Sequence, residues 1–291
     1  MNGQRALVIG GTGMLGLPVA KRLQADGFTV TVMSSHPEAA REKLGDKFTI
    51  VAGDVTDPDS LRPAIEGQHF VHINLNARLD PERYQRIEID GTANVVKVAR
   101  EMGVLRVSNI SGASSRGIVE GPIYVRAKAE AEQAIIDSGV PYSIMRPSWT
   151  FETLPFFIQQ GRAAVLGKQP HPRHWLAADD LAAQVSRAYQ TEQAANRCFY
   201  NFGPQAMTMM EAVTKFCAHV YPELTPEHVS FGKAKMVAMM PGMGELKKAI
   251  PFFEFFNDLK EDFDSTETDR ILGPNLTTLE AWLARHYPRP A

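Results

Sequence analysis

The chain contains 291 residues, of which 44% are hydrophobic and 22% are charged, as is usual for a globular protein with a sizeable core. Its formal net charge of -2 at pH 7 excludes a general nucleic-acid-binding protein. Cys198 and Cys217 lie far apart without a CxxC motif, which excludes the usual zinc patterns and favours a reducing compartment. No apolar segment is long enough for a membrane span, and we expect a cytoplasmic protein.

Short β-branched runs alternate with amphipathic stretches through the first half of the chain. Strands followed by helices predict βαβ units and therefore an α/β fold with a Rossmann-type, doubly wound parallel sheet. Ligands of such sheets bind at the carboxyl ends of the strands. We predict strands at 5–9, 29–33, 48–52, 69–74, 105–110 and 141–145, and helices at 14–26, 38–44, 58–66, 80–102 and 124–138.

The alternation of strand and helix patterns ends after residue 147, where prolines cluster and strand patterns become sparse. We therefore predict a dinucleotide-binding domain over residues 1–147. Residues 148–291 would form a smaller, mostly helical part that binds substrate or a partner, packs on the first domain and could share strands with it.

A glycine-rich segment follows the first predicted strand and opens the first predicted helix. Glycine is needed there because side chains would block both the tight turn and the approach of a pyrophosphate. The helix N-terminus adds unpaired N–H groups and a partial positive charge. This context predicts that the segment binds NAD or NADP. Its residues are Gly10, Gly11, Thr12, Gly13, Met14, Leu15 and Gly16.

The second predicted strand ends without the acidic residue that usually binds the ribose hydroxyls of NAD. Ser34, Ser35 and His36, with Arg41 behind them, could instead meet the 2′-phosphate of NADP, so NADPH is favoured over NADH. A plain solvated loop is the alternative. After the third strand, Asp54 could accept the adenine amino group and Val55 could pack on the base; the alternative there is a local loop cap.

The chain resembles the short-chain dehydrogenase/reductase superfamily, in particular its atypical and extended branches, the NmrA-like and sugar-epimerase-like proteins. The resemblance spans essentially the whole chain in the right order. Its motifs are Gly10–Gly16, Gly53–Asp57, Asp90–Asn94, Tyr124–Lys128, Met145–Pro147, Trp175–Ala182, Leu272–Asn275 and Thr278–Leu283.

This resemblance implies catalytic roles for a tyrosine, a lysine and a serine. Tyr124 would be the general acid/base of hydride transfer, and Lys128 would bind the nicotinamide ribose and favour the phenolate. The two side chains are four residues apart and would share one helix face. Ser111 or Ser114 would orient the substrate oxygen, and Asn74 and Pro147 would lie beside the cofactor.

The sequence departs from the superfamily pattern at three places. Glu88 stands where extended members often have asparagine, and Ala113 falls on a position that they use catalytically. The fourth strand ends in His72-Ile73-Asn74 instead of small residues, and we interpret His72 as a buried strand histidine. These departures favour a non-catalytic NAD(P)-binding sensor or assembly protein as an alternative to an enzyme.

Aromatic residues follow Pro147 and could line an apolar substrate pocket. Trp149, Phe151 and Phe156 are the candidates, and the alternatives are core positions of the smaller part or a face for a partner or second subunit, as in a homodimer. No metal site is predicted. The sequence therefore predicts an NAD(P)-dependent oxidoreductase, favouring NADPH, that reduces an apolar carbonyl- or quinone-like molecule. A third possibility is an NAD-dependent epimerase or dehydratase.

Overall fold

The computed structural model of the chain describes residues 3–115 and 122–288. Contacts divide the chain into two units. The first comprises Met1–Pro147, Ala178–Asn201 and Ser265–Pro274, and the second comprises Ser148–Ala177, Phe202–Asp264 and Asn275–Ala291. Two segments beyond residue 147 thus belong with the predicted dinucleotide-binding domain.

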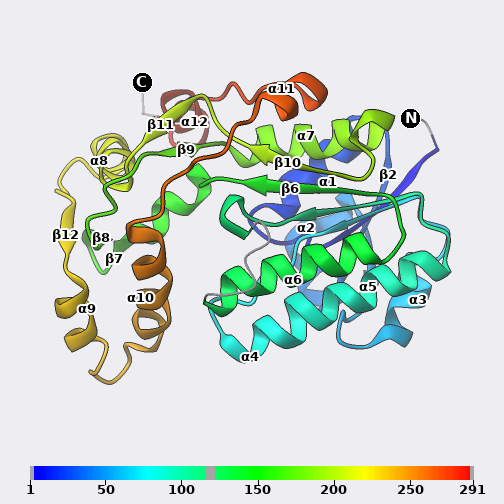
Figure 1. The fold of residues 1–291 in the computed structure, drawn as a ribbon, viewed down its shortest axis with the longest axis horizontal. Helices are drawn as coiled ribbons and strands as arrows, with labels where there is room; N and C mark the ends of the chain where they lie inside the picture. Colours follow the sequence, from blue (N-terminus) through cyan, green and yellow to red (C-terminus); the bar gives the residue numbers. More distant parts are fainter. Residues whose placement is uncertain (1–2, 116–121, 289–291) are drawn as a thin grey trace. The chain divides into compact units, whose positions relative to one another are not determined.

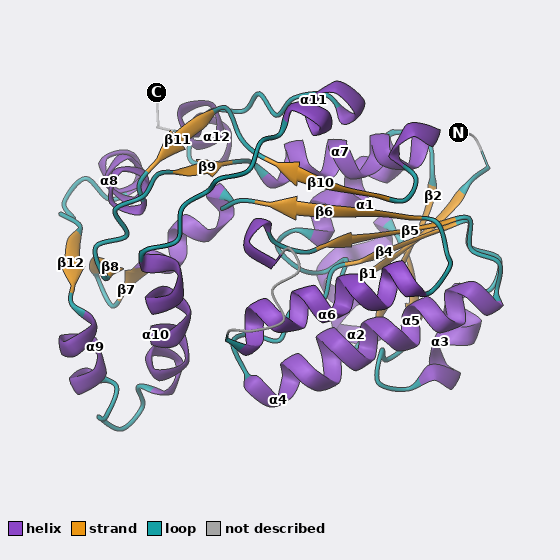
Figure 2. Cartoon of the chain, viewed as in Figure 1, coloured by secondary structure: helices purple, strands orange, loops and turns teal. Residues whose placement is uncertain are grey.

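The first unit is built on a seven-stranded parallel sheet, drawn as orange arrows in Figure 2. The strand order is β10-β6-β5-β4-β1-β2-β3, so the chain reverses direction across the sheet between β1 and β4, as in a doubly wound fold. The predicted fold class is confirmed. The strands are β1 (Arg5–Ile9), β2 (Thr29–Ser34), β3 (Thr49–Ala52), β4 (Phe70–Ile73), β5 (Arg106–Ile110), β6 (Tyr142–Pro147) and β10 (Arg197–Asn201).

Helices cover both faces of this sheet (Figure 1). The α3, α5 and α6 helices pack side by side on one face, and α1, α7 and α11 lie on the other. Apolar residues of the first group and of the strands, such as Leu7, Leu61 and Val95, form a continuous buried core. The helices are α1 (Gly16–Ala25), α2 (Pro37–Leu44), α3 (Pro58–Ile65), α4 (Pro81–Arg83), α5 (Asp90–Glu101), α6 (Ile123–Asp137), α7 (Ala178–Gln190) and α11 (Thr266–Leu272), with short 3-10 turns η1 (Gly45–Lys47), η3 (Ala113–Ser115) and η5 (Glu192–Ala194).

Local sequence signals explain where several helices begin. Asp57 caps α3 by accepting a hydrogen bond from the Asp59 N–H at 3.1 Å, and Pro58 takes the first helical position, where a missing N–H costs little. Asp80 caps α4 in the same way, with Pro81 after it. Both helices thus begin at an Asp-Pro pair.

The predicted helix over 80–102 is not continuous. A π-helical turn, η2 (Tyr84–Ile89), separates α4 from α5. Its hydrogen bond from the Asp90 N–H to the Gln85 carbonyl spans five residues rather than four, so the turn widens. Strand β10 is a second difference, because its short sequence Arg197–Asn201 carried no strand prediction and yet pairs with β6 at the edge of the sheet.

The second unit combines short strands with helices around its own core. Phe151, Trp175 and Phe216 are fully buried there, and the Phe151 and Trp175 rings stack at a centroid distance of 6.4 Å. Its elements are η4 (Phe151–Phe157), β7 (Ile158–Gln159), β8 (Arg162–Leu166), β9 (Arg173–Trp175), β11 (Gln205–Met207), α8 (Met209–Val220), β12 (Glu227–Val229), α9 (Phe231–Val237), α10 (Gly244–Asn257) and α12 (Leu279–His286).

Candidate dinucleotide site and catalytic pair

The glycine loop joins β1 to α1 with no room for side chains at its two ends. Gly10 has a φ of +79°, and a Cβ on it would lie 2.1 Å from the Asn74 carbonyl oxygen. A Cβ on Gly16 would lie 2.2 Å from the Gly10 carbonyl oxygen. The Gly13 N–H donates to that same Gly10 carbonyl at 2.9 Å and closes the turn. The first and last glycines are therefore required by the fold itself.

Gly13, the middle glycine, is exposed and has a different surrounding. A Cβ placed on it would meet a single atom within 4 Å, the Gly10 carbonyl oxygen at 3.2 Å. Met14 beside it is 39% exposed, and α1 begins two residues later with no side-chain cap on its N-terminus. An open glycine in front of uncapped helical N–H groups is a cradle that fits a pyrophosphate.

Serine hydroxyls at the end of β2 organise the loop before α2. Ser34 Oγ accepts a hydrogen bond from the His36 N–H at 3.1 Å, and Ser35 Oγ is hydrogen-bonded to His36 Nδ1 at 3.0 Å. These three predicted residues therefore form one local cluster at the carboxyl end of β2. Arg41 forms an ion pair with Glu38 on the same helix at 2.5 Å.

The predicted residues after β3 have mainly local partners in the structure. Asp54 Oδ1 accepts hydrogen bonds from the Thr56 N–H and hydroxyl, both at 2.8 Å, as in the alternative of a loop cap. Val55 is buried in the core, and its side chain fills the space in front of Gly91. A contact between either residue and an adenine stays a prediction.

Asn74 extends the glycine loop site to the end of β4. Its N–H donates to the Ile9 carbonyl at 3.1 Å, and its Nδ2 lies 3.1 Å from the position that a Gly16 Cβ would take. Pro147 ends β6 and is buried. Both lie at the carboxyl ends of parallel strands, the edge at which such sheets bind their ligands.

His72 lies inside β4 and is fully buried. Its Nδ1 is hydrogen-bonded to Ser108 Oγ at 2.7 Å, and Ser108 Oγ is hydrogen-bonded in turn to the Tyr189 hydroxyl at 2.5 Å. Burial lowers the pKa of His72 to about 3, because the charged imidazole would lose its hydration. His72 is therefore a neutral core residue, in agreement with the interpretation made from the sequence.

The buried imidazole predicts a loss of stability in mild acid. Between pH 6.5 and pH 3 the unfolded chain binds a proton at this histidine and the folded chain does not, so the free energy of unfolding falls as the pH falls. For His72→Asn, which keeps a polar partner for Ser108, we expect a decrease between pH 6 and pH 4.5 that is smaller than in the wild type by about 2 kcal/mol. Urea unfolding at both pH values measures this; equal decreases in the two proteins would contradict it.

The serines after β5 lie in and beside η3. Ser111 is buried, its N–H donates to the Met145 carbonyl at 2.8 Å, and its Oγ is hydrogen-bonded to Ser115 Oγ at 2.9 Å. Ser114 is half-buried on the same turn. The sequence did not single out Ser115, which is 1% exposed and ties Ser111 to the turn. The choice between Ser111 and Ser114 as the orienting serine stays open.

Tyr124 and Lys128 lie one turn apart on α6, as the spacing predicts. Tyr124 is 9% exposed, and its ring lies 6.5 Å from the ring of Tyr84 on η2. Lys128 Nζ donates to the Leu75 carbonyl at 3.3 Å, and Leu75 is the residue after Asn74. Lys128 thus reaches the loop that leaves the carboxyl end of β4, beside the glycine loop. Its second partner is Glu88 of η2, whose Oε2 lies 2.8 Å from Nζ.

The three predicted substrate residues have different surroundings within the second unit. Phe151 is fully buried in its core, which is the alternative that the sequence left open. Phe156 is 65% exposed. Trp149 is half-buried in a cluster of rings, with centroids between 5.7 and 6.1 Å from those of Trp175, Phe252, Phe253 and Phe256.

A family model described as NAD(P)H-binding matches residues 10–190, which include the glycine loop and the Tyr124–Lys128 pair. The chain belongs to the NAD(P)H-binding family. The predicted membership of the short-chain dehydrogenase/reductase superfamily is confirmed. The match ends with α7.

Known proteins similar to this NAD(P)H-binding chain have different functions. An NAD(P)H azoreductase from Xenophilus azovorans is 24% identical over 242 residues, 82% of this chain and 81% of that protein. Photosystem II assembly factor Ycf39 from Cyanophora paradoxa is 24% identical over 314 residues, 97% of this chain and 92% of the factor. The structure of Citrobacter sp. triphenylmethane reductase complexed with NADP(H) aligns with a TM-score of 0.76 and 19% identity, over 97% of this chain and 99% of that one.

Lys43 is a candidate residue that sequence reasoning missed. It lies on α2, and its Nζ donates to the Thr12 carbonyl of the glycine loop at 2.8 Å. Lys43 therefore links the glycine loop to α2, the helix that follows Ser34–His36. The two partners are 31 residues apart, and α2 also carries Arg41, so the sequence gave no reason to choose the lysine.

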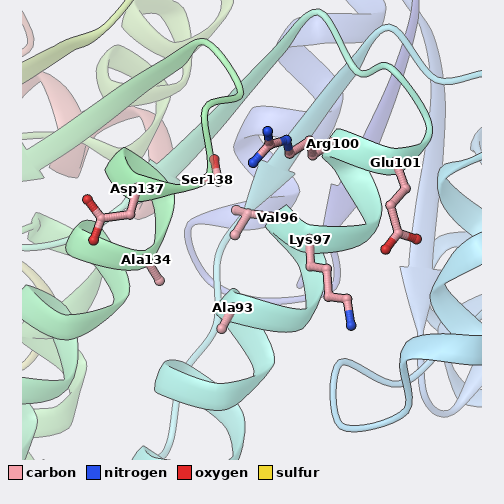
Figure 3. Close-up of a pocket in the computed structure, with 8 residues that line it drawn as sticks. All are labelled: Ala93, Val96, Lys97, Arg100, Glu101, Ala134, Asp137 and Ser138. Atoms are coloured by element: carbon pink, nitrogen blue, oxygen red, sulfur yellow. The ribbon is translucent and has the colours of Figure 1, made fainter.

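A groove of about 630 Å³ lies between α5 and α6 of the NAD(P)H-binding unit (Figure 3). It is lined by alanine and charged side chains of the two helices, and none of the predicted site residues contributes to it. Within residues 3–115 and 122–288, no helix is long and apolar enough to cross a membrane. The same residues include no group of three or more histidine, cysteine, aspartate or glutamate side chains that could hold a metal ion.

Proposed function

We propose that this protein is an NADPH-dependent reductase of an apolar, conjugated carbonyl- or quinone-like molecule. The observation that carries the proposal is the position of Lys128, which reaches the Leu75 carbonyl beside the glycine loop while Tyr124 stands one turn earlier on the same helix. This position supports a role for Tyr124 as general acid and for Lys128 as its cation, beside the loop proposed to hold the cofactor.

Different residues of the first unit would bind different parts of the cofactor. The backbone N–H groups at the start of α1, with Gly13 open in front of them, would bind the pyrophosphate. Lys43, with the Ser34–His36 cluster, would meet the 2′-phosphate, and Lys128 would hold the nicotinamide ribose. NADPH, when bound, supplies a hydride. Tyr124 would donate the proton that completes the reduction.

Within the second unit, Trp149 and the exposed Phe156 are proposed as residues that suit an apolar ligand. A half-buried indole beside three phenylalanine rings suits a flat apolar acceptor. The similarity to an azoreductase supports a conjugated acceptor.

Oxidation of NADPH, followed by its absorbance, tests the proposal with a panel of azo dyes, quinones and aromatic aldehydes. We expect turnover with at least one class at a rate well above that of a protein-free control. NADPH binding without turnover on any acceptor would favour the second candidate, a non-catalytic assembly or sensor protein. That candidate is supported by the similarity to the Ycf39 assembly factor over 97% of this chain.

Lys43 provides a separate prediction about cofactor choice. For Lys43→Ala we expect the Kd for NADPH to rise about 10-fold, equivalent to about 1.4 kcal/mol, because a charge-assisted contact to the 2′-phosphate is lost. The Kd for NADH, which lacks this phosphate, should stay within about twofold. The control is Lys47→Ala, an exposed lysine of η1 that binds the Gln24 side chain only through its backbone carbonyl. Equal losses for both cofactors would remove Lys43 as the phosphate-binding residue.

A further inference from the structure

A buried carboxylate neutralises the lysine of the proposed catalytic pair. The Glu88 side chain is 4% exposed, and its Oε2 lies 2.8 Å from Lys128 Nζ. Its Oε1 accepts a hydrogen bond from the Ala77 N–H at 2.7 Å. The carboxylate therefore contacts a backbone N–H through one oxygen and the Lys128 ammonium through the other. The ammonium of Lys128 has an opposite charge in direct contact.

The backbone at Glu88 and in the loop before it departs from regular helix geometry. Glu88 lies in the π-helical turn η2, which packs on α6. The loop before it contains Arg78 and Leu79, both with positive φ near +55°, and Ala77 of this loop is the residue that binds Glu88. Backbone that deviates in this way is retained where the surrounding contacts fix it, and such deviations cluster at functional sites.

Among the described residues, η2, α5, η3 and β6 pack on α6, the helix that carries Tyr124. From η2, the ring of Tyr84 lies 6.5 Å from that of Tyr124, and burial followed by the charge of Glu88 raises the pKa of Tyr84. Elsewhere in η2, Arg86 is exposed. From β6, Arg146 is bound to Glu132, two turns along α6 from Tyr124.

The charged residues of α5 act elsewhere. Asp90 accepts a hydrogen bond from Gln85, and Lys97, Arg100 and Glu101 lie beside the far end of α6, near Asp137. The η3 turn carries serines and alanine, and Tyr142 stands at the opposite end of β6. Among the described residues, Lys128, four positions from Tyr124 on α6, forms an ion pair with Glu88 of η2.

We propose that Glu88 is a positioning residue that fixes Lys128 and cancels its charge toward Tyr124, so that the phenol stays protonated at neutral pH and the site favours reduction over oxidation. An uncompensated lysine would stabilise the phenolate, which is the form needed to accept a proton. With Glu88 in contact, the acid form persists. In the reduction of a carbonyl, carbon takes the hydride from NADPH, oxygen takes the proton from Tyr124 Oη, and the phenolate regains a proton from water.

The inference rests on the proposed function, and its test uses a measurement that needs no turnover. The full-length protein is labelled with ¹³C at tyrosine Cζ, and the Tyr124 signal is assigned by its loss in Tyr124→Phe. We expect Glu88→Gln, which keeps the shape and the acceptor for Ala77, to lower the midpoint of the Tyr124 titration by about one pH unit. Glu88→Asp, which keeps the charge, should restore most of the wild-type value.

Glu132→Gln is the matched control. Glu132 is also 4% exposed and also bound to a cation, Arg146 at 2.5 Å, so its loss perturbs α6 to a similar degree without changing the charge beside Tyr124. A Tyr124 midpoint that is unchanged in Glu88→Gln, or that moves equally in Glu132→Gln, would overturn the role of Glu88. If the Tyr124 midpoint shifts in Glu88→Gln but the protein reduces no acceptor, the role of Glu88 is supported and the reductase function is rejected. If the protein reduces an acceptor but the midpoint does not shift, the reductase function is supported and the role of Glu88 is rejected.

Discussion

Replacing Tyr124 by phenylalanine is expected to lower kcat for the reduced acceptor by about 10²- to 10⁴-fold, because the general acid is removed while the ring stays in place. NADPH affinity should remain within about twofold of the wild type, since the phenol hydroxyl acts on the substrate rather than on the cofactor phosphates. The ring is buried against Tyr84, so phenylalanine fills the same space. Steady-state kinetics with a titration of NADPH binding measure both quantities.

Tyr142→Phe is the control for this variant. Tyr142 begins β6 at the edge of the sheet opposite to the glycine loop and is half-buried, so loss of its hydroxyl should leave kcat unchanged. Undiminished turnover in a well-folded Tyr124→Phe protein would remove Tyr124 as the acid. Loss of NADPH binding in that variant would instead indicate a structural role.

The second large effect is expected at Gly13. For Gly13→Val we expect NADPH affinity to fall on the order of 100-fold, equivalent to about 2.7 kcal/mol, because the side chain would occupy the space left open for the pyrophosphate. The fold should tolerate the change, since a Cβ at Gly13 meets only one atom within 4 Å. Gly10→Ala would not separate binding from folding, because its Cβ would lie 2.1 Å from a backbone oxygen.

Gly232→Val serves as the control for Gly13→Val. Gly232 is exposed on α9, and a Cβ there meets nothing within 4 Å. Unaltered NADPH affinity in a folded Gly13→Val protein would contradict the placement of the pyrophosphate at this loop.

The sequence was most informative where a residue acts through its own stretch of backbone. Strands such as β1 and β5 were predicted within one or two residues, because their β-branched runs are bounded by caps and glycines. Gly10 and Gly16 were identified for the same reason, since the turn they form is local. The π-helical turn η2 could not be predicted, because the apolar spacing over 80–102 is compatible with an uninterrupted helix.

The sequence pattern could not predict contacts between segments that lie far apart in the chain. Lys43 reaches Thr12 and Glu88 reaches Lys128 across 31 and 40 residues, and nothing local marks either partner among the other charged residues of its element. Glu88 was noticed only as a departure from the superfamily pattern, and it favoured a non-catalytic protein. The structure shows it bound to the proposed catalytic lysine instead, which gives the departure a chemical interpretation.

The most direct test of the account is a fluorescence titration of the purified, full-length protein with NADPH and, separately, with NADH. We expect saturable binding of both cofactors, with NADPH bound about 10-fold more tightly because of its 2′-phosphate. Tighter binding of NADH would contradict the assignment of Lys43 and the serine cluster. Binding of neither cofactor would contradict the central claim that the glycine loop and the Tyr124–Lys128 pair serve a nicotinamide dinucleotide.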